Sequence, residues 1–263
     1  MQKGVSVRRA CHIMHLAPSG LYYAPTADRN AALRQRLHEV ARPGLGYRMA
    51  SALLKAEFGA LNHKRVYRLW KQEHLTRKKR KGKRRGGATV PMSTTRANQV
   101  WCLDFCHDAC LNGSKLKVLA AKDEYTRECL ALEVAIRLNS HSVRRILQNL
   151  IVEHGAPQYL RSDNGPEFIA QHLSIWLGTQ GSQSQFIKPG SPWHREPLGW
   201  RHAESFMARL RAECLDAEVF HNVADAQMKL NVFRRYYNQE RPHSALGYVP
   251  PAQFAEKCKR EGG

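Results

Sequence analysis

The chain has 263 residues, of which 42 are lysine or arginine and 22 are aspartate or glutamate, giving a formal net charge of +20. An apolar content of 43% supports a packed core, and the length suits two domains. No apolar run reaches the roughly 18 residues of a membrane span. So large a positive excess is more than solubility requires, and it indicates a polyanionic partner, most simply nucleic acid.

The cysteines help to exclude further classes of protein. They are seven in number, and none forms a C-x-x-C pair, so a disulfide framework is not expected. Cys102, Cys106 and Cys110 have three residues between neighbours, which is not a usual zinc-ligand spacing. The first residues also lack the apolar segment and cleavage site of a signal peptide. We therefore expect a cytoplasmic protein in a reducing compartment, with no membrane partner.

The first part of the chain predicts short helices. Residues 6–25 suggest a small helical pair, and residues 28–41, 46–59 and 62–75 each place apolar residues at helical spacing. The last stretch opens on Asn62, a good N-cap. The last two stretches, joined by a short turn, have the dimensions of a helix-turn-helix. This unit would expose three cations to DNA: Lys64, Arg65 and Arg68.

A basic block, "TRKKRKGKRR", follows at residues 76–85. Such a block repels itself and would follow a phosphate backbone through counterion release. The alternative is a solvated linker without a ligand. On the first interpretation its DNA-binding cations are Lys78, Lys79, Arg80, Lys81, Arg84 and Arg85.

After this block the pattern changes to strands and helices. Residues 99–106, 116–123 and 126–136 are rich in β-branched and aromatic side chains and predict a three-stranded meander. A helix at 140–155, a strand at 157–163, a helix at 166–181, a short strand at 184–190 and a helix from residue 203 follow. This order predicts an α/β fold, a mixed sheet flanked by helices, after a small all-α region.

Acidic residues adjoin two of the predicted strands. Asp104 lies within the first strand, and Asp163 lies at the carboxyl end of the fourth. If these strands are neighbours, both carboxylates face one crevice, where a divalent cation would offset the cost of burying them. Two cations in phosphodiester chemistry need a third acid, and Glu204, at the start of the last helix, is the candidate. For a single aspartate at a strand end, a cap or surface turn is the simpler interpretation.

Four segments carry a family resemblance. "WCLDFCHD", "LRSDNGPEF", "AESFMARLRAECL" and "YYNQERPHSALGYVPPAQF" closely resemble the second-reading-frame product of bacterial insertion-sequence transposases, which have a retroviral-integrase-like core of the RNase H-like fold. "RPGLGYRMASALLK" and "NHKRVYRLWKQEHL" resemble that family's helix-turn-helix region. The resemblance covers nearly the whole chain and divides it into a helix-turn-helix region at 1–75, a basic linker at 76–95 and a catalytic core with a helical tail at 96–257.

The resemblance implies a D-D-E recombinase that cleaves DNA strands and transfers them in a metal-dependent reaction. Asp104, Asp163 and Glu204 match the catalytic metal ligands, for two Mg²⁺ ions with Mn²⁺ as a substitute. Asn164 and Glu167 match the loop after the second acid and would help to position substrate.

Other residues and partners follow from the same resemblance. Arg211 matches a basic residue that contacts DNA, although it could instead balance Glu213 at the surface. Asp108 and Asp123 are interpreted as structural. The implied partners are the element's DNA ends and target, an upstream-frame protein or fusion, and further copies of the chain on DNA, in the bacterial cytoplasm and associated with the nucleoid.

The segment before Glu204 departs from the family pattern. Forty residues separate Asp163 from Glu204, more than the family has, and "HREPLGWRHA" at 194–203 replaces an asparagine–glycine turn. A longer loop costs little to close, but a shifted carboxylate reacts far more slowly. Two alternatives therefore stay open: an inactive remnant that only binds DNA, and an RNase H-like nuclease of another purpose, which would leave the helix-turn-helix unexplained.

Overall fold

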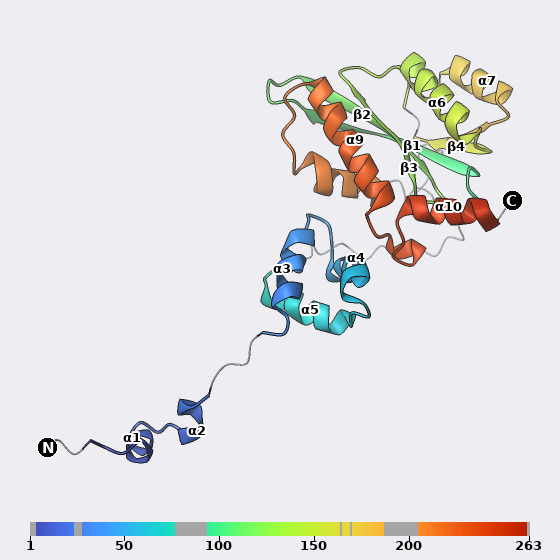
Figure 1. Ribbon diagram of the computed structural model, residues 1–263. Helices are drawn as coiled ribbons and strands as arrows, with labels where there is room; N and C mark the ends of the chain where they lie inside the picture. The colour runs from blue at the N-terminus through green and yellow to red at the C-terminus, as the bar shows by residue number, and fades with distance from the viewer. Residues whose placement is uncertain are drawn as a thin grey trace, which may run out of the picture.

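The computed structural model describes residues 4–23, 28–76, 94–163, 165–168, 170–186 and 205–261. Its secondary structure follows the predicted order, with short helices first and a sheet with flanking helices after them (Figure 1). Within these ranges no helix is both long and apolar enough to cross a membrane.

The first two helices are small. They are α1 (Val7–Ile13) and α2 (Pro18–Leu21). Their only buried residue is Cys11, while Met14, Tyr22 and Tyr23 are largely exposed. The predicted helical pair therefore exists, but α2 is a single turn and the pair has no core of its own.

Three further helices form the helix-turn-helix unit. They are α3 (Ala31–Val40), α4 (Tyr47–Phe58) and α5 (His63–Gln72). Asn62 caps α5 as predicted, because its side chain accepts a hydrogen bond from the backbone of Lys64. The shared core of this unit consists of Leu33, Leu37, Leu45, Ala50, Leu54, Val66, Leu69 and Trp70.

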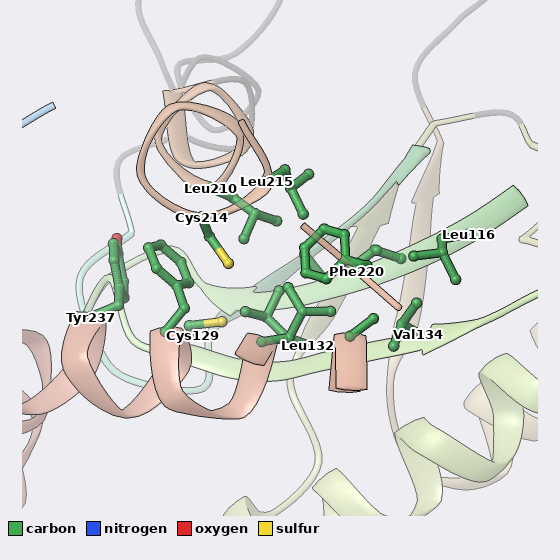
Figure 2. Packing of buried hydrophobic residues seen from close by; sticks show 14 of the residues in the cluster. Leu116, Cys129, Leu132, Val134, Leu210, Cys214, Leu215, Phe220 and Tyr237 are labelled. Carbon is green, nitrogen blue, oxygen red and sulfur yellow. The ribbon is translucent and has the colours of Figure 1, made fainter. Parts of the chain in front are cut away.

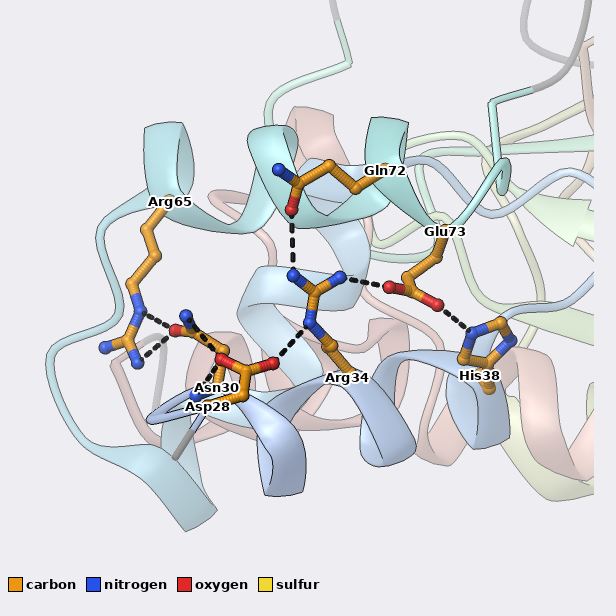
Figure 3. Close-up of polar contacts among 7 residues, drawn as sticks. All are labelled: Asp28, Asn30, Arg34, His38, Arg65, Gln72 and Glu73. Carbon is orange, nitrogen blue, oxygen red and sulfur yellow. Dashed lines mark hydrogen bonds and ion pairs between the residues drawn. The ribbon is translucent and has the colours of Figure 1, made fainter. Parts of the chain in front are cut away.

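Polar contacts join α3 to the end of α5 (Figure 3). Arg34 pairs with Glu73 and donates a hydrogen bond to Gln72 at 3.0 Å. His38 lies 2.8 Å from the other carboxylate oxygen of Glu73. Each exposed ion pair contributes little to stability, but together these contacts hold the end of α5 against α3.

The second part of the chain builds one five-stranded sheet with the order β3–β2–β1–β4–β5. The first three strands are antiparallel neighbours, and β4 and β5 run parallel to β1. The strands are β1 (Val100–Ala109), β2 (Lys115–Asp123), β3 (Cys129–Ala135), β4 (Tyr159–Ser162) and β5 (Gln183–Phe186). The predicted mixed sheet is therefore present.

Helices cover both faces of this sheet (Figure 1). On one face lie α6 (Ser140–His154) and α7 (Gln171–Thr179), which pack on Trp101, Leu103 and Leu119. The other face is covered by α9 (Val223–Gln239) and by the 205–215 helix, which is α-helical over 205–210 and π-helical over Arg211–Leu215. A short 3₁₀ turn (Ser244–Leu246) and α10 (Pro251–Glu261) complete the chain.

The core under α9 joins elements that are distant in sequence (Figure 2). Leu132 of β3, Leu210 and Cys214 of the 205–215 helix, and Tyr237 of α9 are all buried in it. Because side chains alternate between the two faces of a strand, each side chain of the sheet packs into only one of the two cores. The face that holds this core is also the face on which the candidate site lies.

Three predicted elements differ in detail. The helix expected from residue 166 begins at Gln171, because Phe168 is buried against the sheet and holds residues 165–168 in a turn. The strand expected at 184–190 is described only at Gln183–Phe186, and the rest lies outside the described residues. The helix expected from residue 203 contains a π turn, in which Asp216 N donates to Arg211 O at 2.7 Å.

Candidate functional site

Asp104 and Asp163 occupy matching positions on neighbouring strands. β1 and β4 are parallel, and the last of their paired residues are Cys102 and Arg161. Asp104 follows Cys102 by two positions, and Asp163 follows Arg161 by two, so the register carried forward sets the two aspartates abreast. Both side chains are half-buried.

The two aspartates also share a face of the sheet. Cys102 Sγ and Arg161 Nη1 both donate to Glu124 Oε1, at 2.6 Å and 2.5 Å, so these paired residues point the same way. Side chains two positions apart on a strand face the same side. The carboxylates of Asp104 and Asp163 therefore project toward the face covered by the 205–215 helix.

The loop after Asp163 is tied to the sheet. Gly165 N donates to Asp163 Oδ1 at 3.1 Å, and a Cβ at Gly165 would lie 3.1 Å from that same oxygen. Glu167 forms an ion pair with Lys117. Burial works against ionisation of Glu167, but this pair and its own backbone N–H hold its pKa below the usual value.

Two aromatic contacts also hold the loop after Asp163 against the sheet. Lys117 Nζ lies 4.1 Å from the ring centre of Phe105, and Phe105 stacks on Phe168 at 4.9 Å. Since Phe105 directly follows Asp104, the loop after one aspartate rests on the neighbour of the other. Asn164, the other predicted positioning residue, lies outside the described residues.

The third predicted acid, Glu204, also lies outside the described residues. Phe206, two positions later, is buried in the same core as Ala120, the residue that pairs with Asp104 across β1 and β2. The helix that follows Glu204 thus packs beside the aspartate pair. Within the described ranges no three His, Cys, Asp or Glu side chains gather as metal ligands, and these ranges include only two of the three predicted ones.

A buried lysine shares this face. Lys122 of β2 pairs with Cys102 and is 3% exposed, and its Nζ lies 5.7 Å from the ring centre of Phe206. Burial, with the nearby charge of Arg127 second, lowers the pKa of Lys122 to about 8. No local sequence pattern predicts this burial, because it comes from packing between distant segments.

The structure changes the interpretation of Arg211. Its Nη2 donates to the carbonyl oxygen of His107 at 3.0 Å, and its Nη1 lies 3.8 Å from Asp216. Glu213, which was considered as its surface partner, is buried and paired with Arg241 instead. Arg211 is therefore a half-exposed cation beside β1, the strand of Asp104.

The other acids of the sheet have distinct positions. Asp123 accepts hydrogen bonds from the backbone N–H groups of Asn98, Tyr125 and Thr126, so it shapes the turn after β2. This is the structural role predicted for it. Asp108 accepts from the N–H of Ala109 on the partly exposed end of β1.

The cysteines behave as apolar side chains. Cys110 is buried in the core under α9, and Cys106 packs against it. Burial raises the pKa of Cys106 to about 12 and raises that of Cys102 well above its ordinary value. Because metals bind the thiolate form, these protonated thiols are poor ligands, which agrees with the spacing argument.

The predicted cations of α5 divide into two groups. The side chains of Lys64 and Arg68 are exposed. Arg65 is exposed as well, but its guanidinium donates two hydrogen bonds to Asn30, at 2.8 Å and 2.6 Å (Figure 3). The six predicted cations of the basic block lie outside the described residues.

A groove that the sequence did not indicate lies beside this unit. It measures about 480 Å³ and runs between α4, the start of α5 and the tail at Gly247–Val249. Arg48, Lys55 and His63 line it, and no acidic side chain does. Only the fold brings the tail to α4, so no sequence signal could have revealed it.

Comparison with known proteins agrees with this architecture. Residues 94–192 and 180–251 match families described as integrase core domain, and residues 25–84 match an HTH-like domain. Over 84% of this chain, the fold resembles 74% of a chain in the intasome of simian T-cell lymphotropic virus in complex with PP2A regulatory subunit B56 gamma, with a TM-score of 0.53 and 14% identity.

Two curated relatives give the family. An uncharacterized 39.2 kDa protein of insertion element IS476 from Xanthomonas euvesicatoria is 36% identical over 98% of this chain and 74% of its own length. Transposase InsD of insertion element IS2 from Escherichia coli is 28% identical over 87% of this chain and 79% of its own length. The chain belongs to the insertion-element transposases, with a helix-turn-helix unit before an integrase core, and its function is DNA transposition.

Proposed function

We propose that this chain cleaves and joins DNA strands at a site formed by Asp104, Asp163 and Glu204. The observation that supports it most is the register of β1 and β4, which sets Asp104 and Asp163 abreast on one face. The packing of Phe206 against that face supports Glu204 as the third acid.

The donor chemistry of the site fits Mg²⁺. Two half-buried carboxylates offer the hard oxygen ligands that Mg²⁺ prefers, and the thiols on the same face are protonated. When bound, two Mg²⁺ ions, or Mn²⁺ in their place, would supply Lewis acidity to the attacking and leaving oxygens of a phosphodiester exchange. Asp104, Asp163 and Glu204 would hold them.

The chain's other residues orient the DNA. The loop anchored by Glu167 would keep Asp163 at a fixed distance from Asp104, and Asn164 would help to position the substrate. Arg211, half-exposed beside β1, would pair with a backbone phosphate near the reacting bond. No covalent intermediate with the protein is needed, because the attacking group is water in cleavage and a DNA 3′-hydroxyl in strand transfer.

DNA recognition is assigned to the first part of the chain. Lys64 and Arg68 of α5, with the basic linker, would neutralise backbone phosphates. We extend this surface to Arg48 and Lys55 in the adjoining groove. Arg65, which is bound to Asn30, would contribute less than its neighbours.

The assembly belongs to the same proposal. Further copies of the chain and an upstream-frame protein, separate or fused, would gather on the element's two ends in the bacterial cytoplasm, associated with the nucleoid. Bringing two ends together requires at least two DNA-binding units, and the helix-turn-helix unit of each chain supplies one of them.

Manganese-dependent nicking of supercoiled plasmid tests this function without knowledge of the element's ends. The chain should nick the plasmid, and Asp104→Asn, Asp163→Asn and Glu204→Gln should each abolish nicking, while Asp108→Asn retains it. A version with residues 194–203 shortened by about five tests the atypical segment. Nicking by the shortened version alone would mean that the segment disables an otherwise intact site. Silence from both would favour a DNA-binding remnant.

A further inference from the structure

The loop between α3 and α4 meets the 205–215 helix at one point. Gly44 has a φ of +82°, and a Cβ built there would lie 2.5 Å from Glu213 Oε1 and 2.7 Å from Glu213 Cγ. Distances this short are not compatible with any side chain. Glycine at this position thus allows the helix-turn-helix unit to approach the core closely.

Glu213 cannot move aside to make room. Arg241 donates to both of its carboxylate oxygens, from Nε at 2.8 Å and from Nη2 at 2.7 Å. The side chain of Glu213 is 5% exposed and that of Arg241 is 1% exposed. A two-point ion pair of this kind has a fixed geometry, and breaking it would leave a buried charge unpaired.

Two further features flank this point. The guanidinium of Arg42 lies 4.5 Å from the ring centre of Tyr236 in α9, within the range of a cation–π interaction. Arg48 of α4 and Tyr248 of the tail line the same groove. The loop is therefore attached to the core at two places, through Glu213 and through α9, and α4 adjoins the tail across the groove.

The position of Glu213 gives these contacts their significance. It lies in the π turn of the 205–215 helix, the helix that follows Glu204 in sequence and packs through Phe206 beside Asp104. Single π turns inside helices are frequent at functional sites. The same helix thus links the DNA-recognition unit to the core beside Asp104.

We propose that Glu213 is a positioning residue, which clamps the helix-turn-helix unit onto the helix after Glu204 through Gly44. This inference rests on the proposed function. DNA held by α4 and α5 would then reach Asp104 and Asp163 at one distance and orientation. Loosening the clamp would spare DNA binding and impair strand cleavage.

Gly44→Ala tests the clamp in the full-length chain, because it leaves the Glu213–Arg241 pair intact and obstructs only the approach. Gly59→Ala is the matched control: Gly59 lies in the same unit with a φ of +68°, but a Cβ there meets nothing within 4 Å. Arg42→Gln is a second variant with little risk to the fold, since Arg42 is exposed.

Three readouts are needed: amide hydrogen exchange, binding to a short fluorescent duplex and manganese-dependent nicking. In Gly44→Ala and Arg42→Gln we expect faster amide exchange at 42–46 and 247–249. The protection of α5 and the affinity for the duplex should both equal those of Gly59→Ala. Nicking should be reduced about tenfold or more. Exchange in Gly44→Ala equal to that in Gly59→Ala would overturn the clamp. So would nicking that falls only in proportion to duplex affinity.

The two proposals can fail separately. If the unmodified chain does not nick, the proposed function fails, while the exchange measurement still decides whether the unit is clamped. If the chain nicks and the Gly44→Ala and Arg42→Gln variants nick equally well, the site stands and the positioning role of Glu213 is wrong.

Discussion

Asn238 of α9 completes the hydrogen bonding of Cys129 on the edge strand β3. Its Oδ1 accepts from Cys129 N at 2.9 Å and its Nδ2 donates to Cys129 O at 2.9 Å. Gln227 does the same for Val134 N and Leu132 O, at 2.9 Å and 2.8 Å. An uncovered edge strand is a template for aggregation, and α9 prevents this with amide side chains. This gives the "YYNQERPHSALGY" segment a structural role.

Removing the amide of Asn238 should destabilise the core. Asn238→Ala leaves a partly buried N–H and C=O without partners, which costs about 1–3 kcal/mol. Asn238→Asp should also destabilise the core, because one carboxylate oxygen still accepts from Cys129 N but the other replaces the donor Nδ2 and faces Cys129 O, acceptor against acceptor. The measurement is the free energy of unfolding in denaturant, with exposed Gln239→Ala as the control. Equal stability of all four proteins would show that the edge of β3 does not need this cap.

The buried Arg161–Glu124 pair should be sensitive to removal of one partner. The side chains are 6% and 2% exposed, so Arg161→Met would leave Glu124 as an unpaired charge, at a cost of about 3–5 kcal/mol. Replacing both by methionine should recover most of that loss. A double-mutant cycle of unfolding free energies tests this, and two independent, additive losses would contradict the coupling.

Lys122 should make stability rise with pH above about 8. Burial lowers its pKa in the folded state to about 8, from 10.5, so between these values the unfolded chain binds more protons than the folded one. The unfolding free energy therefore increases across that window. The shift lowers the unfolding free energy by about 3 kcal/mol, and this destabilisation is present in full below pH 8.

The check is the difference in unfolding free energy between the unmodified chain and Lys122→Met at each pH. Taking the difference cancels the opposite effect of the buried thiols, whose raised pKa values lower stability in alkaline solution. We expect Lys122→Met to be the more stable protein at pH 7 and to lose that advantage by about pH 10. A difference that does not change with pH would mean that Lys122 titrates normally.

The cations of α5 should differ in their effect on DNA binding. Lys64→Ala and Arg68→Ala should each lower the slope of log affinity against log salt by about one unit, the loss of one phosphate contact. Arg65→Ala should change the slope less, because its guanidinium is held by Asn30. Lys257→Ala, an exposed lysine of α10, is the control. An equal change for Arg65 and Lys64 would show that the Asn30 contact yields to DNA.

Local patterns predicted most of the elements and the position of the two aspartates relative to their strands. Strands β1 to β3 lie in segments rich in β-branched and aromatic side chains, α6 has a clear apolar stripe, and the strands that carry Asp104 and Asp163 are neighbours. Short-range chemistry also predicted the cap at Asn62. These features depend on residues within one or two turns of one another.

Contacts between distant segments were not predictable in this way. Gly44 reads as an ordinary turn residue, and only the folded chain sets it against Glu213. The burial of Phe168, which delays the start of α7, depends on Phe105 in another strand. The spacing of Arg211 and Glu213 suggests a surface ion pair. In the folded chain Glu213 pairs with Arg241 instead, and the side chains of Glu213 and Arg241 are both buried.

The most direct test of the central claim is whether Asp104 and Asp163 jointly bind a divalent ion. Free Mn²⁺ can be followed by electron paramagnetic resonance as the full chain is titrated, with no need for DNA, the element's ends or turnover. We predict tight binding that is lost in Asp104→Asn and in Asp163→Asn and kept in Asp108→Asn. Equal binding by all four proteins would contradict a metal site between β1 and β4.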